Sequence, residues 1–208
     1  VITGEGKAFC AGQDLAEAMD PNGPELESIV REHFNPIITR LRAIEKPIIA
    51  AVNGVAAGAG ANIAMACDIV IAKESASFIQ AFSKIGLIPD SGGTFFLPRI
   101  IGMQKALALM MTGDKVSAKE AEAMNMIYKA VNDEAFENEV KEFAEKLAKM
   151  PTRGLGLTKK AVNETWTNTL SEQLDLEEVL QKEAGGTADF QEGVNAFIEK
   201  RKPIFTGE

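Results

Sequence analysis

The sequence predicts an α/β core over residues 1–131 and a helical subdomain over residues 132–208. Short apolar runs bounded by glycine or proline alternate with helical periodicity up to Val131. From about residue 134 onward, only helical periodicity occurs. The strand–helix–strand spacing of the first part favours right-handed crossovers and a largely parallel sheet.

The apolar runs of the first part are expected to be strands. "VIT" opens the chain and is followed by a glycine-rich loop, and "KPIIAAVNG" is an apolar run bounded by Pro47 and Gly54. "DIVIA", "ASFI" and "IYKAV" predict three more strands. Because no Met precedes Val1 and the first strand is already under way, we expect the chain to lack an N-terminal segment.

Helices are expected between these strands. Apolar residues recur at helical spacing from Glu25 to Ile44, and Pro36 within this stretch predicts a kink or a break. "AAGAGANIAMAC" is interpreted as one helix opened by glycines. "MQKALALMMTG" predicts a helix that ends at Gly113, and Ser117 with Glu120 forms a capping-box pattern.

"GLIPDSGGTFF" is the ambiguous segment, because its acid could cap a helix or move a proton. A helix is expected after it, running through Leu97 and stopping near Pro98. Asp and Ser are both common N-cap residues. The residues alone leave both open as the cap, and the family resemblance given below favours Ser91, which would leave Asp90 free for chemistry.

Composition excludes several classes of function. The chain has 22 basic and 30 acidic residues, a net charge of −8, which argues against a nucleic-acid surface. Cys10 and Cys67 are too few for a disulfide framework or a cysteine-rich zinc site, and they favour a reducing, cytoplasmic setting. His33 is the single histidine, and a solvated helical position is its simplest interpretation. No apolar run is long enough to cross a bilayer.

Two glycine-rich junctions are the candidate ligand sites: "AFCAGQDL" and "NGVAAGAGAN". Small residues let a ligand approach the backbone, and N–H groups from two loops can hold a carbonyl oxygen that gains negative charge. Tight helix–strand packing is the alternative explanation. The GxGxxG, GxxxxGK[ST] and GxSxG motifs are all absent.

Three segments carry a family resemblance. "KAFCAGQDL", "KPIIAAVNGVAAGAGANIAMACDIVIA" and "IGLIPDSGGTFFLPRIIG" resemble, in order and spacing, the enoyl-CoA hydratase/isomerase (crotonase) superfamily, and "FIEKRKPIF" is similar to its C-terminal end. "AGAGAN", "SFIQAFSKIGLIPDSGGT" and "LPR" look most like an isomerase of bacterial phenylacetate breakdown.

The resemblance implies a fold and a substrate class. The fold would be the crotonase (ClpP-like) fold of stacked ββα units, with the helical subdomain assembling homotrimers or hexamers. The substrate would be an acyl-CoA thioester, with coenzyme A as part of the substrate and no metal or redox cofactor. The missing N-terminal segment would supply part of the coenzyme A pocket.

The resemblance also assigns residues. The backbone N–H groups of Gln13 and Ala59 would form an oxyanion hole. Lys200 matches a position that can reach the coenzyme A phosphates of a neighbouring subunit, although a solvated tail lysine is an equal alternative. The substrate-binding residues carried over are Cys10, Ala11, Gly12, Asp14, Leu15, Gly58, Gly60, Asn62, Phe82 and Lys200.

Departures from the family pattern point to the reaction. Family hydratases use two glutamates to activate water, and the matching positions here are Asn62 and Phe82, neither of which can act as a base. Asp90 stands where several family isomerases carry an acid, within walls expected from Phe78, Phe82 and Ile85. The residues therefore favour an acyl-CoA isomerase that uses one carboxylate. The alternatives are an enoyl-CoA hydratase of fatty-acid β-oxidation and a non-catalytic acyl-CoA-binding or RNA-binding homologue.

Overall fold

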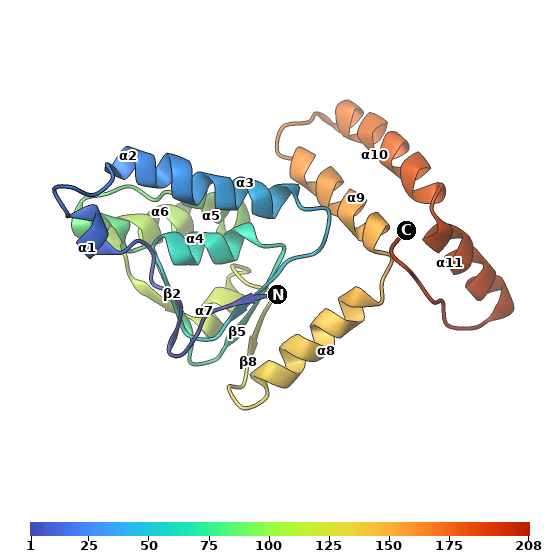
Figure 1. The fold of residues 1–208 in the computed structure, drawn as a ribbon, viewed down its shortest axis with the longest axis horizontal. Coiled ribbons are helices and arrows are strands. Elements are labelled where there is room, and N and C mark those ends of the chain that lie inside the picture. Colours follow the sequence, from blue (N-terminus) through green and yellow to red (C-terminus); the bar gives the residue numbers. More distant parts are fainter. The chain divides into compact units, whose positions relative to one another are not determined.

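The computed structural model describes residues 1–208, and the chain divides into two compact units. The first unit comprises residues 1–42 and 48–140, and the second comprises residues 43–47 and 141–208. All strands belong to the first unit, and the second consists mainly of helices (Figure 1). The predicted α/β core with a helical C-terminal region is therefore confirmed.

The first sheet contains four parallel strands in the order β1-β3-β5-β8. Their bounds are Ile2–Thr3, Ile49–Val52, Ile69–Lys73 and Lys129–Val131. All four residues of β3 are buried, as expected for an internal strand of a parallel sheet. These strands match the runs "VIT", "KPIIAAVNG", "DIVIA" and "IYKAV".

The second sheet has the order β2-β4-β6-β7, so strands alternate between the two sheets until β6. Its strands are Ala8–Cys10, Val55–Ala57, Ser77–Ile79 and Lys115–Ser117, and only the β6–β7 pair is antiparallel. Sequence analysis found only β6. Strand β2 lies in a glycine-rich stretch and β7 in a polar stretch next to glycine, so neither shows a long apolar run, and β4 occupies a glycine–alanine run that was interpreted as helix.

Helix α4 (Ala59–Ala66) follows β4 directly and is almost entirely buried. Its small residues allow the backbone to pack closely against the second sheet. A Cβ atom at Gly60 would lie 2.2 Å from the carbonyl oxygen of Cys10. Only glycine therefore fits between α4 and the end of β2.

The stretch from Leu26 to Ala43 is continuously helical, although Pro36 predicted a break. Helix α2 (Leu26–Ser28) passes into a π-helical turn (Ile29–Phe34) and then into α3 (Asn35–Ala43). The N–H of Asn35 bonds to the carbonyl of Val30, five residues back. Pro36 has no N–H to donate. The wider π-helical turn immediately before it has already changed the hydrogen-bond pattern, so the helix continues through the proline.

Three helices follow η2, a 3₁₀ turn over Ala81–Ile85: α5 (Gly93–Ile101), α6 (Met103–Thr112) and α7 (Ala118–Ala123). The predicted stop of α5 at Pro98 is wrong. Proline removes only the bond to the carbonyl of Thr94, which is a solvent-exposed residue. The predicted end of α6 at a left-handed Gly113 and the Ser117–Glu120 capping box are both confirmed.

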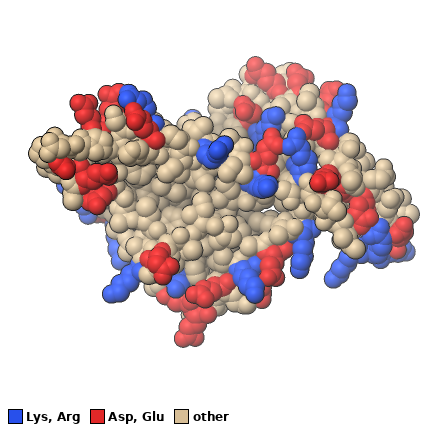
Figure 2. All heavy atoms as spheres, in the orientation of Figure 1, with Lys and Arg blue, Asp and Glu red and all other residues tan.

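The second unit contains α9 (Thr152–Glu164), α10 (Leu170–Gly185) and α11 (Ala188–Glu199), and α8 (Phe136–Ala148) leads into it. Arg153 pairs with Glu45 and with Glu183, and thereby links residues 43–47 to the helices. No helix combines the length and apolarity that crossing a bilayer requires. On the face shown in Figure 2, basic and acidic side chains are interspersed and form no continuous basic patch.

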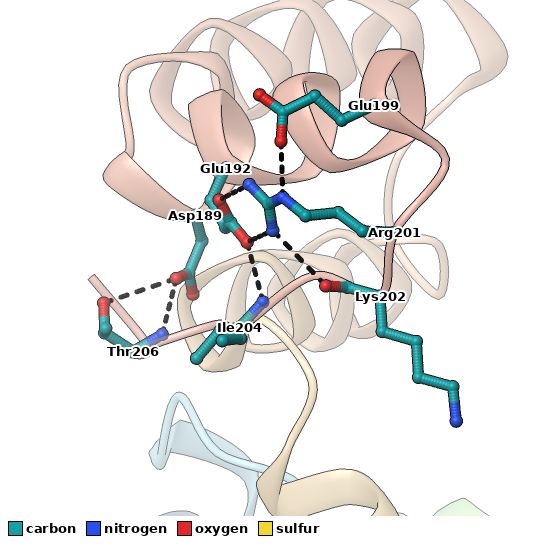
Figure 3. Close-up of polar contacts among 7 residues, drawn as sticks. All are labelled: Asp189, Glu192, Glu199, Arg201, Lys202, Ile204 and Thr206. Atoms are coloured by element: carbon teal, nitrogen blue, oxygen red, sulfur yellow. Dashed lines mark hydrogen bonds and ion pairs between the residues drawn. The ribbon is translucent and has the colours of Figure 1, made fainter.

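The segment after α11 turns back along that helix (Figure 3). The Asp189 carboxylate accepts hydrogen bonds from the backbone N–H of Thr206 at 2.7 Å and of Gly207 at 2.9 Å. Arg201 bonds to both oxygens of Glu192, at 2.5 and 2.7 Å, and lowers the pKa of that carboxyl to about 2. A buried carboxylate, Asp189, and a half-buried one, Glu192, together fix the path of the last residues.

Candidate active site

The first part of the site is the turn between β4 and α4. Gly58 has φ 54° and ψ −127°, a combination that side chains disfavour, and it precedes Ala59 without a side-chain cap. The N–H of Ala59 has no hydrogen-bond partner within the chain, as is usual at a helix start without a cap. This N–H is available to bind an oxygen atom.

The second part is the loop between β2 and α1 (Leu15–Ala18). Gly12 has φ 96°, and a Cβ atom there would lie 3.6 Å from the Ala59 nitrogen. The adjoining N–H of Gln13 is likewise unpaired within the chain. The two residues assigned to an oxyanion hole therefore come from segments that pack against each other.

The other residues predicted to bind substrate in this region lie on or beside the same loop. The Asp14 side chain accepts from the Ala16 N–H at 2.8 Å and caps α1, whereas Gln13 donates to Glu17 at 2.6 Å. Cys10 is half-buried beside Gly60. Ala11 and Leu15 are exposed, so an acyl chain could reach both.

The third part is the turn that carries Asp90. Ser91 and Gly92 both have left-handed backbone, with φ of 50° and 75°, and Gly92 is the N-cap residue of α5, so no side chain caps this helix. The prediction that Ser91 caps this helix is wrong, because its left-handed backbone aims the hydroxyl elsewhere. Ser91 Oγ donates to Asp90 Oδ1 at 2.8 Å instead.

The Asp90 carboxyl group differs in the direction of its pKa shift from the other carboxyl groups whose pKa is shifted. Burial raises the pKa of its carboxyl group, and the hydrogen bond from Ser91 partly opposes this rise. The other carboxyl groups with a shifted pKa all have a lowered one: Glu120, Asp133, Glu172 and Glu192. A half-buried carboxylate with raised pKa is a better proton acceptor than an exposed one.

Asn62 and Phe82, which the family resemblance assigns to the positions of the two hydratase acids, are both buried. Asn62 has no exposed surface, and its amide donates to the Asp90 carbonyl oxygen at 2.8 Å. Gln80, which sequence analysis did not single out, donates to Asn62 Oδ1 at 2.8 Å. Phe82 faces Gly58, since a Cβ atom there would lie 3.8 Å from its ring. Neither position presents an acid to a ligand.

The remaining candidates lie elsewhere. Lys200 is exposed at the C-terminal end of α11, in the second unit. Of the expected apolar walls, Phe78 belongs to the core with 1% exposure, whereas Ile85 is 53% exposed. His33 is exposed on the π-helical turn. No three His, Cys, Asp or Glu side chains gather as a metal site would require.

The whole chain, residues 1–208, matches the Enoyl-CoA hydratase/isomerase family. The chain belongs to this family. The sequence resemblance is thereby confirmed, and the protein is an enzyme of the enoyl-CoA hydratase/isomerase (crotonase) superfamily.

Two relatives show how the family divides. The 1,2-epoxyphenylacetyl-CoA isomerase of Escherichia coli K12 is 51% identical over 211 residues, which include 100% of this chain and 80% of the relative. A protein of Rhodobacter capsulatus named probable enoyl-CoA hydratase is 48% identical, with the same coverage. The predicted likeness to 1,2-epoxyphenylacetyl-CoA isomerase is confirmed, but hydratase names are also found among the relatives.

Solved structures agree on the fold. The enoyl-CoA hydratase of Bacillus anthracis superposes with a TM-score of 0.90 at 37% identity, covering 99% of this chain and 80% of that one. An enoyl-CoA hydratase/isomerase of Mycobacterium abscessus gives 0.91 at 35% identity, covering 97% and 79%. The predicted crotonase fold is confirmed.

Proposed function

We propose that this enzyme is an acyl-CoA isomerase with Asp90 as its single catalytic base. The observation that carries the proposal is the half-buried Asp90 carboxyl, whose pKa is raised, while neither hydratase acid position holds an acid. The substrate would be a 1,2-epoxyphenylacetyl-CoA-like thioester, a Δ3-enoyl-CoA, or both. Coenzyme A would be part of the substrate, and the mechanism needs no metal or redox cofactor.

The proposed reaction uses two sets of groups. The thioester oxygen accepts hydrogen bonds from the N–H groups of Gln13 and Ala59, which stabilise the negative charge of an enolate. Asp90 removes a proton from the α-carbon and returns it to the γ-carbon, so the double bond moves and the atoms balance. A raised pKa suits this cycle, because the carboxylate accepts a proton readily and its acid form remains able to donate.

The ring substrate is supported by the name of the Escherichia coli relative. In an epoxidised aromatic thioester, the same N–H pair would hold the thioester oxygen while the ring expands to an oxepin. Buried Asn62 and Phe82 stand where the two water-activating acids of a hydratase are expected, and Asp90 is then the single acid of the proposed site. We therefore favour isomerisation over hydration of the substrate.

The decisive experiment compares wild-type enzyme with Asp90→Asn on a 3-enoyl-CoA and on 1,2-epoxyphenylacetyl-CoA. Loss of a general base is expected to lower kcat by about 10²–10⁴-fold. Undiminished turnover of both substrates by Asp90→Asn would remove Asp90 from this role. Rapid hydration of crotonyl-CoA by the wild type would favour the hydratase alternative, and acyl-CoA binding without turnover would favour a binding protein.

We also propose a homotrimer or hexamer assembled through the second unit. Its helices expose large apolar side chains, among them Val162, Leu170, Leu174 and Val179 at 52–76% and Phe197 at 85%. Such surface is typical of protein interfaces. Light scattering after size-exclusion chromatography tests this, and a monomer at micromolar concentration would contradict it. Lys200 as a coenzyme A contact and the cytoplasmic location stay predictions.

A further inference from the structure

A buried side-chain amide, that of Asn62, lies beside Asp90. Asn62 lies on α4, three residues after Ala59, whose N–H is the proposed oxyanion donor. Its side chain crosses to the turn that precedes α5 and binds the backbone carbonyl of Asp90. One side chain therefore connects the helix of the oxyanion hole to the residue proposed as the base.

The orientation of this amide is fully determined. A carbonyl oxygen can only accept, so the atom that faces Asp90 must be the Nδ2 donor of Asn62. The Oδ1 atom then faces Gln80, which must present its Nε2 donor at 2.8 Å. Gly93 closes the remaining side, since a Cβ atom there would lie 2.4 Å from Asn62 Nδ2.

Stability alone does not account for this arrangement. The Asp90 carbonyl already accepts from the N–H of Gly93 at 2.8 Å, so it would not be left unpaired without Asn62. Gln80 is 2% exposed, and its Oε1 atom is buried without a hydrogen-bond partner. Burying such an atom is unfavourable, and an apolar residue would avoid the cost. The pair therefore serves something besides packing.

We propose that Asn62, oriented by Gln80, is a positioning residue that fixes the Asp90 backbone at a set distance from the oxyanion hole. This inference rests on the proposed function of Asp90. Proton transfer requires the carboxylate to lie within hydrogen-bond reach of the carbon acid while the thioester oxygen is held at Ala59. A displacement of about 1 Å between such groups can lower turnover about 100-fold.

The test uses the paired variant Asn62→Leu/Gln80→Leu in the full chain. The two changes remove the donor and its orienting partner together and leave no unpaired polar atom between them, so folding is preserved better than by either change alone. With a 3-enoyl-CoA substrate, we expect kcat to fall about 10–100-fold, KM to stay within about twofold, and Tm to stay close to that of the wild type.

Asn53 offers a matched control in the same unit. Its amide also bonds to backbone groups, donating to Gly6 O at 3.1 Å and accepting from the Gly4 N–H at 3.0 Å. Asn53→Leu should lower Tm and leave kcat per folded molecule unchanged. Should the paired variant not fold, Asn62→Asp is measured per folded molecule instead. An aspartate has the same shape and still accepts the hydrogen bond from Gln80, but when ionised it cannot donate to the Asp90 carbonyl.

Asp90→Asn separates the two proposals. Where Asp90→Asn abolishes turnover and the paired variant retains wild-type kcat, the positioning role is overturned and the proposed function stands. Where Asp90→Asn leaves turnover unchanged, the function itself is wrong. If the inference is correct, adding the paired change to Asp90→Asn lowers kcat no further, because both act through the same carboxylate.

Discussion

Helices α4 and α5 begin differently from α7 and α10. The first two start at Gly58 and Gly92, which have positive φ and provide no side-chain cap. The other two start at Ser117 and Thr169, each within a complete capping box that closes with a glutamate. A capping box occupies the N–H groups that a helix start leaves unpaired, whereas a glycine start leaves them available.

The difference follows the location of the proposed site. At α4 the unpaired N–H of Ala59 lies beside Gly12, and at α5 the left-handed turn follows the Asp90 carboxylate. At α7 and α10 side chains of the protein itself bond N–H groups of the first turn, namely those of Glu120 and Glu172. Side-chain caps thus stabilise helices where no ligand is expected, whereas the helix starts at the proposed site have no such cap and remain able to bind a ligand.

Among the changes at helix starts, Gly58→Ala should give the largest effect. An alanine has room, with only the Phe82 ring 3.8 Å away, but it cannot adopt φ 54° with ψ −127° without strain of about 1–3 kcal/mol. Relief of that strain would move the Ala59 N–H, so kcat should fall by about 10²-fold or more. Steady-state kinetics with a 3-enoyl-CoA provides the measurement.

Gly102→Ala is the control for Gly58→Ala. Gly102 also precedes a helix without a side-chain cap, has φ 81° and ψ 156°, and has open space around it. Its substitution should lower Tm comparably but leave kcat per folded molecule near wild type. Equal losses of kcat in both variants would show that strain, and not the exposed N–H, explains the result.

Ser117→Ala should have a moderate effect on stability alone. Ser117 Oγ accepts from the Glu120 N–H at 3.3 Å and donates to the Glu120 carboxylate at 2.6 Å. Loss of such a cap should lower Tm by about 2–4 °C in a chain of this size. Calorimetry measures the shift, and a changed kcat per folded molecule would contradict the division between capped and uncapped helices.

Removal of the Ser91 hydroxyl should move the pH profile. The hydrogen bond from Ser91 favours the ionised Asp90, so its loss raises the pKa of that carboxyl further. Because the base must be ionised, the acid limb of kcat/KM should move to higher pH. Ser91→Gly and Ser91→Ala should shift the limb alike, but only glycine relieves the strain of the left-handed backbone at φ 50° and should raise Tm relative to alanine. An unmoved limb in both variants would exclude the proposed interaction.

Asp90→Asn should have the smallest effect on stability, a rise in Tm at neutral pH of roughly 1–3 °C, in contrast to the large loss of kcat expected of the same variant. Burial raises the pKa of Asp90 in the folded state, so its contribution to stability is greatest when it is protonated and is lost as pH rises through that pKa. A neutral amide avoids this loss. The gain should vanish below about pH 4, where the acid is protonated in both states. Thermal melts between pH 3 and 8 test the sign.

Sequence patterns predicted what depends on local chemistry. The capping box at Ser117, the left-handed stop at Gly113 and the long apolar strands each have a signature within a few residues. Strands β2, β4 and β7 have none, because their pairing is set by partners distant in the sequence. For the same reason Ser91 was misassigned as a cap and Gln80 was missed, since their roles depend on a strained turn and on a buried contact across 18 residues.

The parallel first sheet also has a consequence for biosynthesis. Strand β5 obtains its outer neighbour only when β8 is made, since Ile71 pairs with Lys129. At a synthesis rate of about 5–20 residues per second, the roughly 60 intervening residues take about 3–12 s. During that interval a buried, strongly apolar strand edge is unpaired on the ribosome. The nascent chain is therefore most exposed to aggregation, and most dependent on chaperones, just before the helical unit begins to emerge.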